Sequence, residues 1–181
     1  MNISRRLHIG GKVHKHGWEI FNIVPGENVE HVGDARDLSR FNDNTFDELY
    51  ASHVLEHFDY RSEVPAVLLE WKRVLKPDGR ILISVPNLDV LCYVFTHPDV
   101  TTFDDKYQLM RVMFGGHMDE HDYHQTGFFP ELLTWCLASA GFDNIAIVDT
   151  FGIFKDASEI NCAGLPVSLN VCAYKPREGE N

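Results

Sequence analysis

The stretch from residue 47 to residue 87 constrains the fold more than any other part of the chain. Its pattern predicts a strand over Glu48 to Ser52, a helix over Ser62 to Leu75, a turn over Lys76 to Gly79 and a strand over Arg80 to Val85. Strand, helix and strand in this order form a parallel pair joined by a right-handed crossover. The small and polar residues Ser52, His53, Glu56 and His57 follow the first strand. Because open α/β sheets bind ligands beyond the carboxyl ends of their strands, we expect chemistry between Ser52 and His57.

The helix of this unit has an apolar face and recognisable ends. Its apolar residues, Val64, Val67, Leu68, Trp71, Val74 and Leu75, fall at helical spacing. Ser62 is a good N-cap and Pro65 suits the first turn. A turn at residues 76–79 ends the helix, and the run from Arg80 to Val85 is typical of a buried parallel strand.

Other elements extend the same α/β pattern on both sides of this unit. Five further strands are predicted over Leu7 to Ile9, Trp18 to Val24, Val29 to Val32, Asn144 to Asp149 and Val167 to Tyr174. Three further helices are predicted over Leu88 to Phe95, Asp104 to Phe114 and Pro130 to Ala140. At most one helical turn fits between Lys12 and Gly17. Residues 151–166 are expected to be a loop-rich connection.

Length and charge narrow the class of protein. At 181 residues, a single domain over residues 1–175 is expected, with a disordered tail over 176–181. The net charge of -11 argues against nucleic acid as a partner, since phosphate binding needs clustered Lys and Arg. No apolar run approaches the roughly 20 residues of a membrane helix, and the N-terminus is too short and polar for a secretory signal. Four scattered cysteines favour reduced thiols, so we expect a cytoplasmic protein that binds no membrane.

Two phrases of this stretch resemble a known family. ASHVLEHF and RVLKPDGRILISVPN are similar to the segments around the fourth and fifth strands of class I S-adenosylmethionine-dependent methyltransferases. The resemblance runs from about Leu7 to Lys175. It implies a doubly wound, mostly parallel, seven-stranded Rossmann-like sheet whose last strand is antiparallel. It also implies S-adenosyl-L-methionine as cofactor.

The resemblance assigns cofactor contacts to the strand ends. Ile9, Gly10 and Gly11 would hold the methionine end, Asn22 the ribose, Asp34 and Ala35 the adenine, and Ser52 and His53 the face near sulfur. Two glycines after a first strand also let the backbone approach a ligand closely. Asn22 stands where similar methyltransferases have an acid. Asp34 has an alternative role as the cap of a short helical turn.

Three histidines are candidates for the proton acceptor. Methyl transfer to a hydroxyl needs a base at neutral pH, and His53, His57 and His124 are the catalytic candidates, with His53 and His124 favoured. His57 has the alternative role of a packed helix-start residue. His124 lies in the run HMDEHDYH, which is expected to be a polar lid. His117 and His121 have the i, i+4 spacing of a metal-binding helix, but the preceding glycines favour a loop, and no metal ligand is assigned.

These observations predict an S-adenosylmethionine-dependent methyltransferase that acts on a small molecule. The alternative is a methyltransferase-like domain without activity that serves as a binding or assembly module, as the short glycine loop and Asn22 suggest. A nicotinamide dehydrogenase is disfavoured because no GxGxxG follows the first strand. The acceptor molecule is open, and so is the choice between a monomer and a homodimer.

Overall fold

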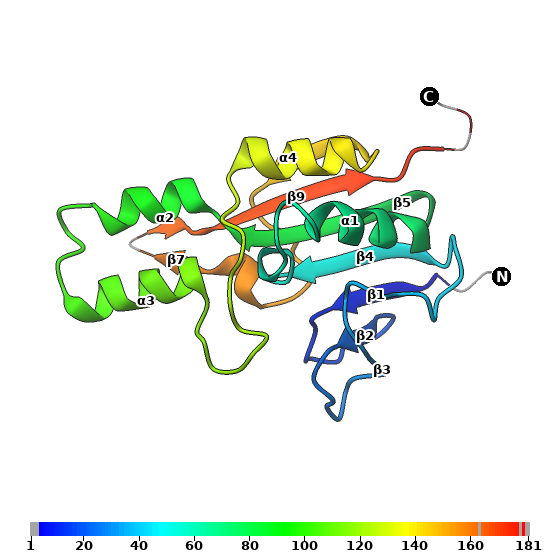
Figure 1. Cartoon of the computed structure of the whole chain (residues 1–181), viewed down its shortest axis with the longest axis horizontal. Coiled ribbons are helices and arrows are strands. Elements are labelled where there is room, and N and C mark those ends of the chain that lie inside the picture. Colours follow the sequence, from blue (N-terminus) through cyan, green and yellow to red (C-terminus); the bar gives the residue numbers. More distant parts are fainter. Residues whose placement is uncertain (1–3, 163, 178, 180–181) are drawn as a thin grey trace.

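The fold is built on one seven-stranded sheet. The computed structural model describes residues 4–162, 164–177 and 179. The sheet has the order β3-β2-β1-β4-β5-β9-β6 (Figure 1). Its strands are β1 (Arg6–Ile9), β2 (Glu19–Asn22), β3 (His31–Val32), β4 (Phe46–Ser52), β5 (Leu75–Pro86), β6 (Asp143–Val148) and β9 (Ser168–Tyr174). The first five pair in parallel, and β9 runs antiparallel to both β5 and β6. The predicted sheet, with its last strand reversed, is therefore confirmed.

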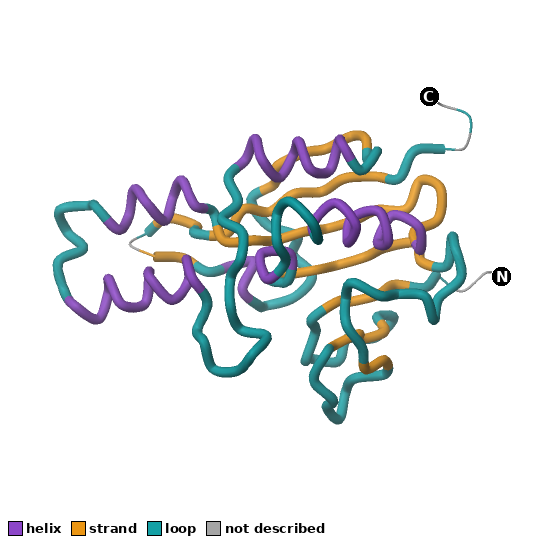
Figure 2. The backbone as a smooth tube through the Cα atoms, viewed as in Figure 1, coloured by secondary structure: helices purple, strands orange, loops and turns teal. Residues whose placement is uncertain are grey.

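Helices are concentrated in the second half of the chain. They are η1 (Leu55–His57), α1 (Val64–Val74), α2 (Leu88–Phe95), α3 (Phe103–Phe114), α4 (Pro130–Ser139) and η2 (Ala157–Glu159). A small hairpin, β7 (Asn161–Cys162) with β8 (Leu165–Pro166), lies in the connection that was predicted to be loop-rich. Figure 2 shows only loops between β1, β2 and β3. The predicted lack of room for a full helix after β1 is thus confirmed.

The two faces of the sheet are covered differently. Alternate residues of β4 and β5, such as Leu49 and Ile81, pack against α1 and α4 in the main core. Tyr50 and Leu82 point to the opposite face, where they meet Trp18 and Phe154. This alternation is the period of two that a strand imposes on its side chains. The second face is therefore covered by aromatic side chains from loops.

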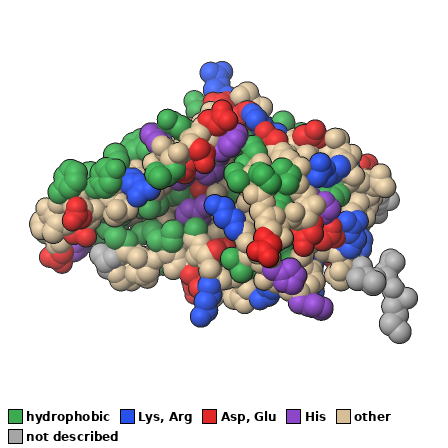
Figure 3. Space-filling view, turned by 90° about the horizontal axis from the view of Figure 1, so that it is seen from below, with side chains coloured by type: hydrophobic (Ala, Val, Ile, Leu, Met, Phe, Trp, Pro, Cys, Tyr) green, Lys and Arg blue, Asp and Glu red, His purple; other side chains and the backbone are tan. Residues whose placement is uncertain are grey.

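Helices α2 and α3 extend past the ends of the strands, on the left of Figure 1. They share a small core of their own, formed by Leu91, Val94, Val100, Leu109 and Val167. Several large apolar side chains of these helices stay exposed, including Phe103 and Tyr107. Figure 3 shows the resulting hydrophobic surface at this end of the molecule.

Two local predictions are wrong at the start and end of α1. Ser62 is not the N-cap, since α1 begins at Val64 and Ser62 instead donates two hydrogen bonds to Asp59. The carboxylate is a stronger acceptor than a hydroxyl, so Asp59 organises the turn before the helix. The predicted turn at residues 76–79 lies within β5 as an irregularity in the register, and Asp78 there has a φ of 60°.

Strand ends also differ from the predicted bounds. The second strand stops at Asn22, because the Asn22 side chain bonds to the backbone and ends the pairing, and the third has only two residues. The predicted disordered tail lies partly outside the described residues, and within it Arg177 pairs with Asp78. No helix among the described residues is long and apolar enough to cross a membrane.

Candidate active site

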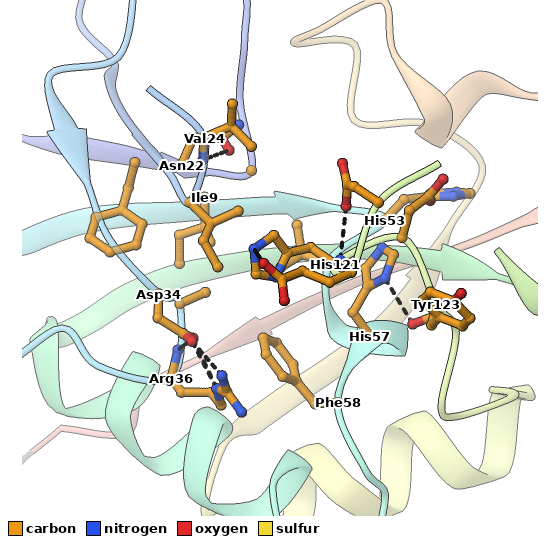
Figure 4. Close-up of a pocket in the computed structure, with 18 of the residues that line it drawn as sticks. Ile9, Asn22, Val24, Asp34, Arg36, His53, His57, Phe58, His121 and Tyr123 are labelled. Carbon is orange, nitrogen blue, oxygen red and sulfur yellow. Dashed lines mark hydrogen bonds and ion pairs between the residues drawn. The ribbon is translucent and has the colours of Figure 1, made fainter. Parts of the chain in front are cut away.

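A cavity of about 670 Å³ opens at the carboxyl ends of β1, β2, β3 and β4. It is lined by Ile9, Gly10 and Lys12, by residues 21–24 and 33–36, by His53, Val54, His57 and Phe58, and by residues 118–123 and Gln125. Figure 4 shows Asp34 and Arg36 on one side of it and His53 and His57 on the other. A volume of this size is typical of small-molecule sites.

Gly10 follows the end of β1 and lines the cavity. Its φ is +78°, and a Cβ there would lie 2.5 Å from Cγ2 of Val54. Its backbone N–H donates to the carbonyl of Phe21 at 2.8 Å. A side chain is thus excluded both by conformation and by space. The backbone of Gly10 can therefore approach a ligand in the cavity.

Both polar atoms of the Asn22 side chain bond to the backbone. Its Nδ2 donates to the carbonyl of Gly11 at 2.8 Å, and its Oδ1 accepts from the N–H of Val24 at 2.9 Å. Asn22 is buried, and it ties the loop after β1 to the turn after β2. An amide can make both bonds at once, whereas a carboxylate could make only the second. The amide thus takes a structural role at a position predicted to contact ribose.

Asp34 lines the cavity, and its carboxylate pairs with Arg36. Nε of Arg36 donates to both carboxylate oxygens at 3.0 Å, and Nη1 of Arg36 donates to Glu63 at 2.6 Å. Hydrogen bonds from Arg36 hold the pKa of Asp34 below its usual range. The Arg36 side chain is about half exposed, so it can swing away at little cost. Asp34 is therefore an ionised acceptor next to the cavity.

At the end of β4, the side chains of Ser52 and His53 point in different directions, and only His53 lines the cavity. The Ser52 hydroxyl donates to Asp156 at 3.2 Å, on the face of the sheet away from the cavity. The next residue, His53, has a φ of 53°, which turns the chain so that His53 lines the cavity. Such a left-handed conformation is uncommon for a residue other than glycine and is often found at functional sites.

A chain of hydrogen bonds fixes the imidazole of His53. The hydroxyl of Ser168 donates to the carbonyl of Ala157 at 2.7 Å, so its oxygen accepts from Nε2 of His53 at 3.0 Å. We therefore assign the proton to Nε2, which leaves a lone pair on Nδ1. Burial lowers the pKa of His53 to about 4, so the ring is neutral at pH 7.

Glu56 is a completely buried carboxyl group on η1. Neither of its carboxylate oxygens has a hydrogen-bond partner among the described residues. Burial raises the pKa of Glu56 to about 8. Its Oε1 lies 3.5 Å from Nδ1 of His53 and 3.8 Å from Nε2 of His124. Burying an acid without partners is costly, so this arrangement calls for an explanation.

His57 and His124 complete a cluster around Glu56. The two imidazole rings meet edge to face with centroids 4.8 Å apart. Nδ1 of His57 donates to the carbonyl of Tyr123 at 3.1 Å, as Figure 4 shows. Burial lowers the pKa of both rings, that of His124 to about 4. Ligand atoms of Glu56, His57 and His124 all lie within 4.8 Å of one another.

The loop 115–127 covers this side of the cavity. The N–H groups of Gln125 and Thr126 both donate to the carbonyl of Glu56, and the Thr126 hydroxyl donates to the carbonyl of Phe58. The segment from Met118 to Tyr123 lines the cavity, which agrees with the predicted lid. It forms no metal-binding helix, because His117 stacks on Tyr123 and bonds to a backbone carbonyl.

The structure brings most of the predicted site residues to one cavity. Ile9, Gly10, Asn22, Asp34, Ala35, His53 and His57 line it, whereas Gly11, Ser52 and His124 do not. Sequence analysis assigned no site role to the apolar residues Ile23, Val24 and Phe58. It placed Glu56 within the stretch where chemistry was expected but gave it no role of its own. Ile23 and Val24 follow directly on Asn22 and are exposed, which is unusual for such residues at a strand end. Glu56 gave a weaker signal, since a carboxylate near a helix start has an ordinary electrostatic explanation.

The cavity has the parts that a nucleoside with an amino-acid tail would need. Apolar side chains such as Ile9 and Ile23 offer a surface for a base, and Asp34 offers an acceptor. Gly10 leaves its backbone open at the other end. The residues present therefore fit S-adenosylmethionine, although the Asn22 amide uses one N–H and one lone pair on the backbone and carries no charge for a ribose.

Comparisons with known proteins agree with this arrangement. A family model described as a methyltransferase domain matches residues 21–83, about a third of the chain. A search of curated proteins found no match. The matched segment runs from β2 to β5 and so includes Asn22, Asp34, His53 and Glu56.

Solved structures show the same fold. A SAM-dependent methyltransferase from Archaeoglobus fulgidus has 19% identity and a TM-score of 0.61, covering 96% of this chain and 87% of that chain. One from Methanosarcina mazei has 17% identity and a TM-score of 0.59, covering 98% and 95%. Larger neighbours are matched in part, since the chain covers 48% of the CurJ carbon methyltransferase (15% identity, TM-score 0.57, 96% of this chain).

These findings confirm the resemblance to class I S-adenosylmethionine-dependent methyltransferases. The seven-stranded sheet is the fold of that class, and residues 21–83 are similar to a methyltransferase domain. The cofactor that this family and fold imply is S-adenosylmethionine.

Proposed function

We propose that the protein is an S-adenosylmethionine-dependent methyltransferase that acts on a small molecule. The observation that carries this proposal is the meeting of four strand ends around one cavity, which brings Gly10, Asp34 and His53 to the same space. Ligands bind at this edge of open α/β sheets. The surface charge supports a small acceptor, because a protein with a net charge of -11 repels nucleic acid.

Each wall of the cavity would hold one part of the cofactor. The backbone at Ile9 and Gly10 would take the methionine end, and Gly11 would shape the loop behind it. Asp34 would accept from the adenine amino group, beside Ala35. The ribose would rest near Asn22 on the apolar surface of Ile23, without a charged partner.

The histidines would serve the methyl transfer itself. When bound, the cofactor supplies an electrophilic methyl group on a sulfonium. A hydroxyl acceptor would have to lose its proton to a base of this chain as it takes the methyl group. His53 and His57 line the cavity, while His124 lies behind it, so His53 is the better placed of the two favoured bases. Holding the partners in line can contribute about 7–11 kcal/mol to the lowered barrier.

Calorimetric titration with S-adenosylhomocysteine, the demethylated product, tests the cofactor assignment. We expect micromolar binding by the protein as it is, and at least tenfold weaker binding by Asp34→Ala, or about 1.4 kcal/mol. Asp37→Ala is the matched control, since Asp37 is exposed and bonds only to Ser39 nearby. Absence of binding at millimolar concentration would count decisively against the proposal.

A second candidate function is an inactive methyltransferase-like module that binds or assembles with other molecules. The specific observation in its favour is that both polar groups of the Asn22 side chain bond to the backbone. The same titration separates the two functions, because the module needs no cofactor. A cytoplasmic location and the choice between monomer and homodimer stay predictions.

A further inference from the structure

In the cluster around Glu56, a carboxyl group and imidazole rings lie close together with no hydrogen bond between them. Both oxygens of Glu56 are unpartnered, and so is Nδ1 of His124. His53 presents the lone pair of Nδ1 to the same carboxyl at 3.5 Å, because its Nε2 carries the proton. Lone pairs that face one another in a buried space repel unless a cation or a proton lies between them.

His57 presents a second lone pair to the cluster. Its Nδ1 donates to the carbonyl of Tyr123 at 3.1 Å, so the neutral ring carries its lone pair on Nε2. A histidine that binds a metal almost always donates its other ring N–H in this way, to a carbonyl or a carboxylate. The hydrogen bond to Tyr123 is thus the outer support expected of a metal ligand.

The backbone holds the two segments of the cluster in fixed relation. Glu56 and His57 lie on η1, and His124 lies on the loop 115–127. The carbonyl of Glu56 accepts from the N–H groups of Gln125 at 2.8 Å and Thr126 at 3.1 Å. The amide of Gln125 also donates to the carbonyl of His57 at 2.8 Å. Gln125 and Thr126 directly follow His124 in the sequence. Their hydrogen bonds therefore hold the ring of His124 near Glu56.

We propose that Glu56, His57 and His124 bind a divalent transition-metal ion at the edge of the cavity. Two imidazoles and one carboxylate form a ligand set typical of catalytic zinc sites and of other open transition-metal sites. The three residues form the one group with metal-ligand proximity that was found among the described residues. Neutral imidazoles are the form that binds a metal ion.

Binding requires a small contraction of the cluster. In a tetrahedral zinc site with bonds of about 2.0–2.1 Å, the ligand atoms lie about 3.4 Å apart. The ligand atoms here lie within 4.8 Å of one another, so each must move by roughly 1 Å or less. Nδ1 of His124 has no hydrogen-bond partner among the described residues.

The site also suggests the substrate class, an inference that rests on the proposed function. Three protein ligands leave a coordination position open, and His57 lines the cavity, so an acceptor oxygen could reach the metal ion. A metal ion lowers the pKa of a bound hydroxyl and so favours its loss of a proton to solvent or a base. Hydroxyl-bearing small molecules are therefore the acceptors that this site would select.

Zinc titration of the full chain tests the site without any cofactor. After treatment with a chelator and dialysis, we expect one Zn²⁺ per chain, bound with micromolar or tighter affinity by calorimetry. Glu56→Gln keeps the shape but removes the charged ligand, and it should weaken binding at least 100-fold. His124→Asn should do the same and serves as a second variant if Glu56→Gln fails to fold. Co²⁺ should give the visible absorption of a four- or five-coordinate ion, and only with the ligands intact.

His121→Asn is the matched control, since His121 lies on the same loop but outside the cluster. It should leave zinc affinity unchanged. Zinc binding weaker than millimolar, or binding that survives both ligand substitutions, would overturn the proposal. Titration with S-adenosylhomocysteine in the absence of metal reports on the proposed function separately, so failure of one inference does not obscure the other.

Discussion

The two sides of the cavity differ in how the hydrogen-bonding groups of their side chains are satisfied. At the ends of β1, β2 and β3, the polar side chain of Asn22 bonds to the backbone, and Gly10 has no side chain. At the end of β4, Glu56 and His124 are buried with polar atoms that bond to nothing in the described chain. We call these the cofactor side and the histidine side.

This difference predicts that ligand binding on the cofactor side depends mainly on the shape of the cavity, and that binding on the histidine side depends on its polar groups. The side at the ends of β1, β2 and β3 can offer a ligand backbone groups, apolar walls and the charged side chains of Lys12, Asp34 and Arg36. Unsatisfied buried groups, by contrast, destabilise the folded protein until a ligand or ion meets them. The histidine side therefore has the larger binding energy still to gain.

The largest expected effect is that of a methyl group added to Gly10. Gly10→Ala forces alanine to a φ of +78° and places Cβ 2.5 Å from Cγ2 of Val54. The backbone strain costs about 1–3 kcal/mol, and Gly10 or Val54, which both line the cavity, must shift to relieve the clash. We expect binding of S-adenosylhomocysteine to fall by about 100-fold, or 2.7 kcal/mol, in a calorimetric titration.

Removal of the opposing methyl group sharpens this test. In Gly10→Ala with Val54→Ala, the added Cβ would be 3.9 Å from its neighbour, which is ordinary contact. The double variant should recover at least part of the affinity. Gly26→Ala is a control, because Gly26 has no positive φ and its Cβ would lie 3.3 Å from Cγ2 of Val29, a closer contact than usual but no overlap like that at Gly10. Unchanged affinity in Gly10→Ala would show that the cofactor side does not rely on close backbone approach.

The second prediction concerns His8, the unpartnered polar side chain of β1. Its Nδ1 is buried without a hydrogen-bond partner, between the rings of Tyr50 and Phe154 on the face away from the cavity. Burial lowers the pKa of His8 to about 4, and the charge of Asp156 opposes this only in part. Unlike Glu56, His8 has no neighbours among the described residues that could bind a metal ion or a ligand together with it. Substitution of His8 should therefore change the stability of the protein and leave ligand binding unchanged.

The sign of the effect follows from the lowered pKa. The unfolded chain binds a proton near pH 6.5 and the folded protein only near pH 4, so stability is complete above pH 6.5 and declines as the pH falls towards 4. The expected loss is about 3 kcal/mol. Urea unfolding of the protein and of His8→Asn at pH 7.5 and pH 4.5 measures it. A variant that loses as much stability on acidification as the parent would refute the assignment.

The sequence predicted the sheet because its signals were local. The apolar runs at Leu7 and Ile81 and the turn residues after them fix strands by their immediate neighbours, and helix Leu88 to Phe95 was predicted to the residue. Ser62 was misassigned because a better acceptor, Asp59, lies three residues before it. Boundaries depend on such competition between neighbours, which a pattern does not resolve.

The candidate site was predicted less completely, for a physical reason. The His117 and His121 spacing suggested a metal pair within one segment, yet the cluster that forms joins Glu56 and His57 to His124 across the fold. Such a contact depends on how a loop lies over the sheet. The role of the Asn22 amide could not be predicted from the sequence either. Its hydrogen bonds to Gly11 and Val24 depend on the geometry of the turns that contain these two residues.

The third prediction concerns the replacement of Asn22, on the cofactor side, by the acid that similar proteins have at this position. Asn22→Asp removes the donor to the carbonyl of Gly11 and places a carboxylate against it. We expect a loss of about 1–3 kcal/mol of stability in urea unfolding, and no tighter binding of S-adenosylhomocysteine. Asp43→Asn is a surface control with little effect. If Asn22→Asp instead tightened binding, the amide would not be committed to the backbone, and the contrast between the two sides would weaken.

The smallest expected effect concerns the attachment of the loop 115–127. The buried hydroxyl of Thr126 donates to the carbonyl of Phe58 at 2.6 Å, and Thr126→Val keeps the shape but removes this donor. We expect a loss of about 1 kcal/mol of stability. Zinc affinity should fall several-fold, because His124 is then held less firmly, while S-adenosylhomocysteine affinity stays within twofold. Thr134→Val, which removes a hydroxyl bonded within α4, is the control for loss of a threonine hydroxyl alone. An equal loss of affinity for both ligands would mean that the loop supports the whole cavity, and the division into two sides would no longer describe the molecule.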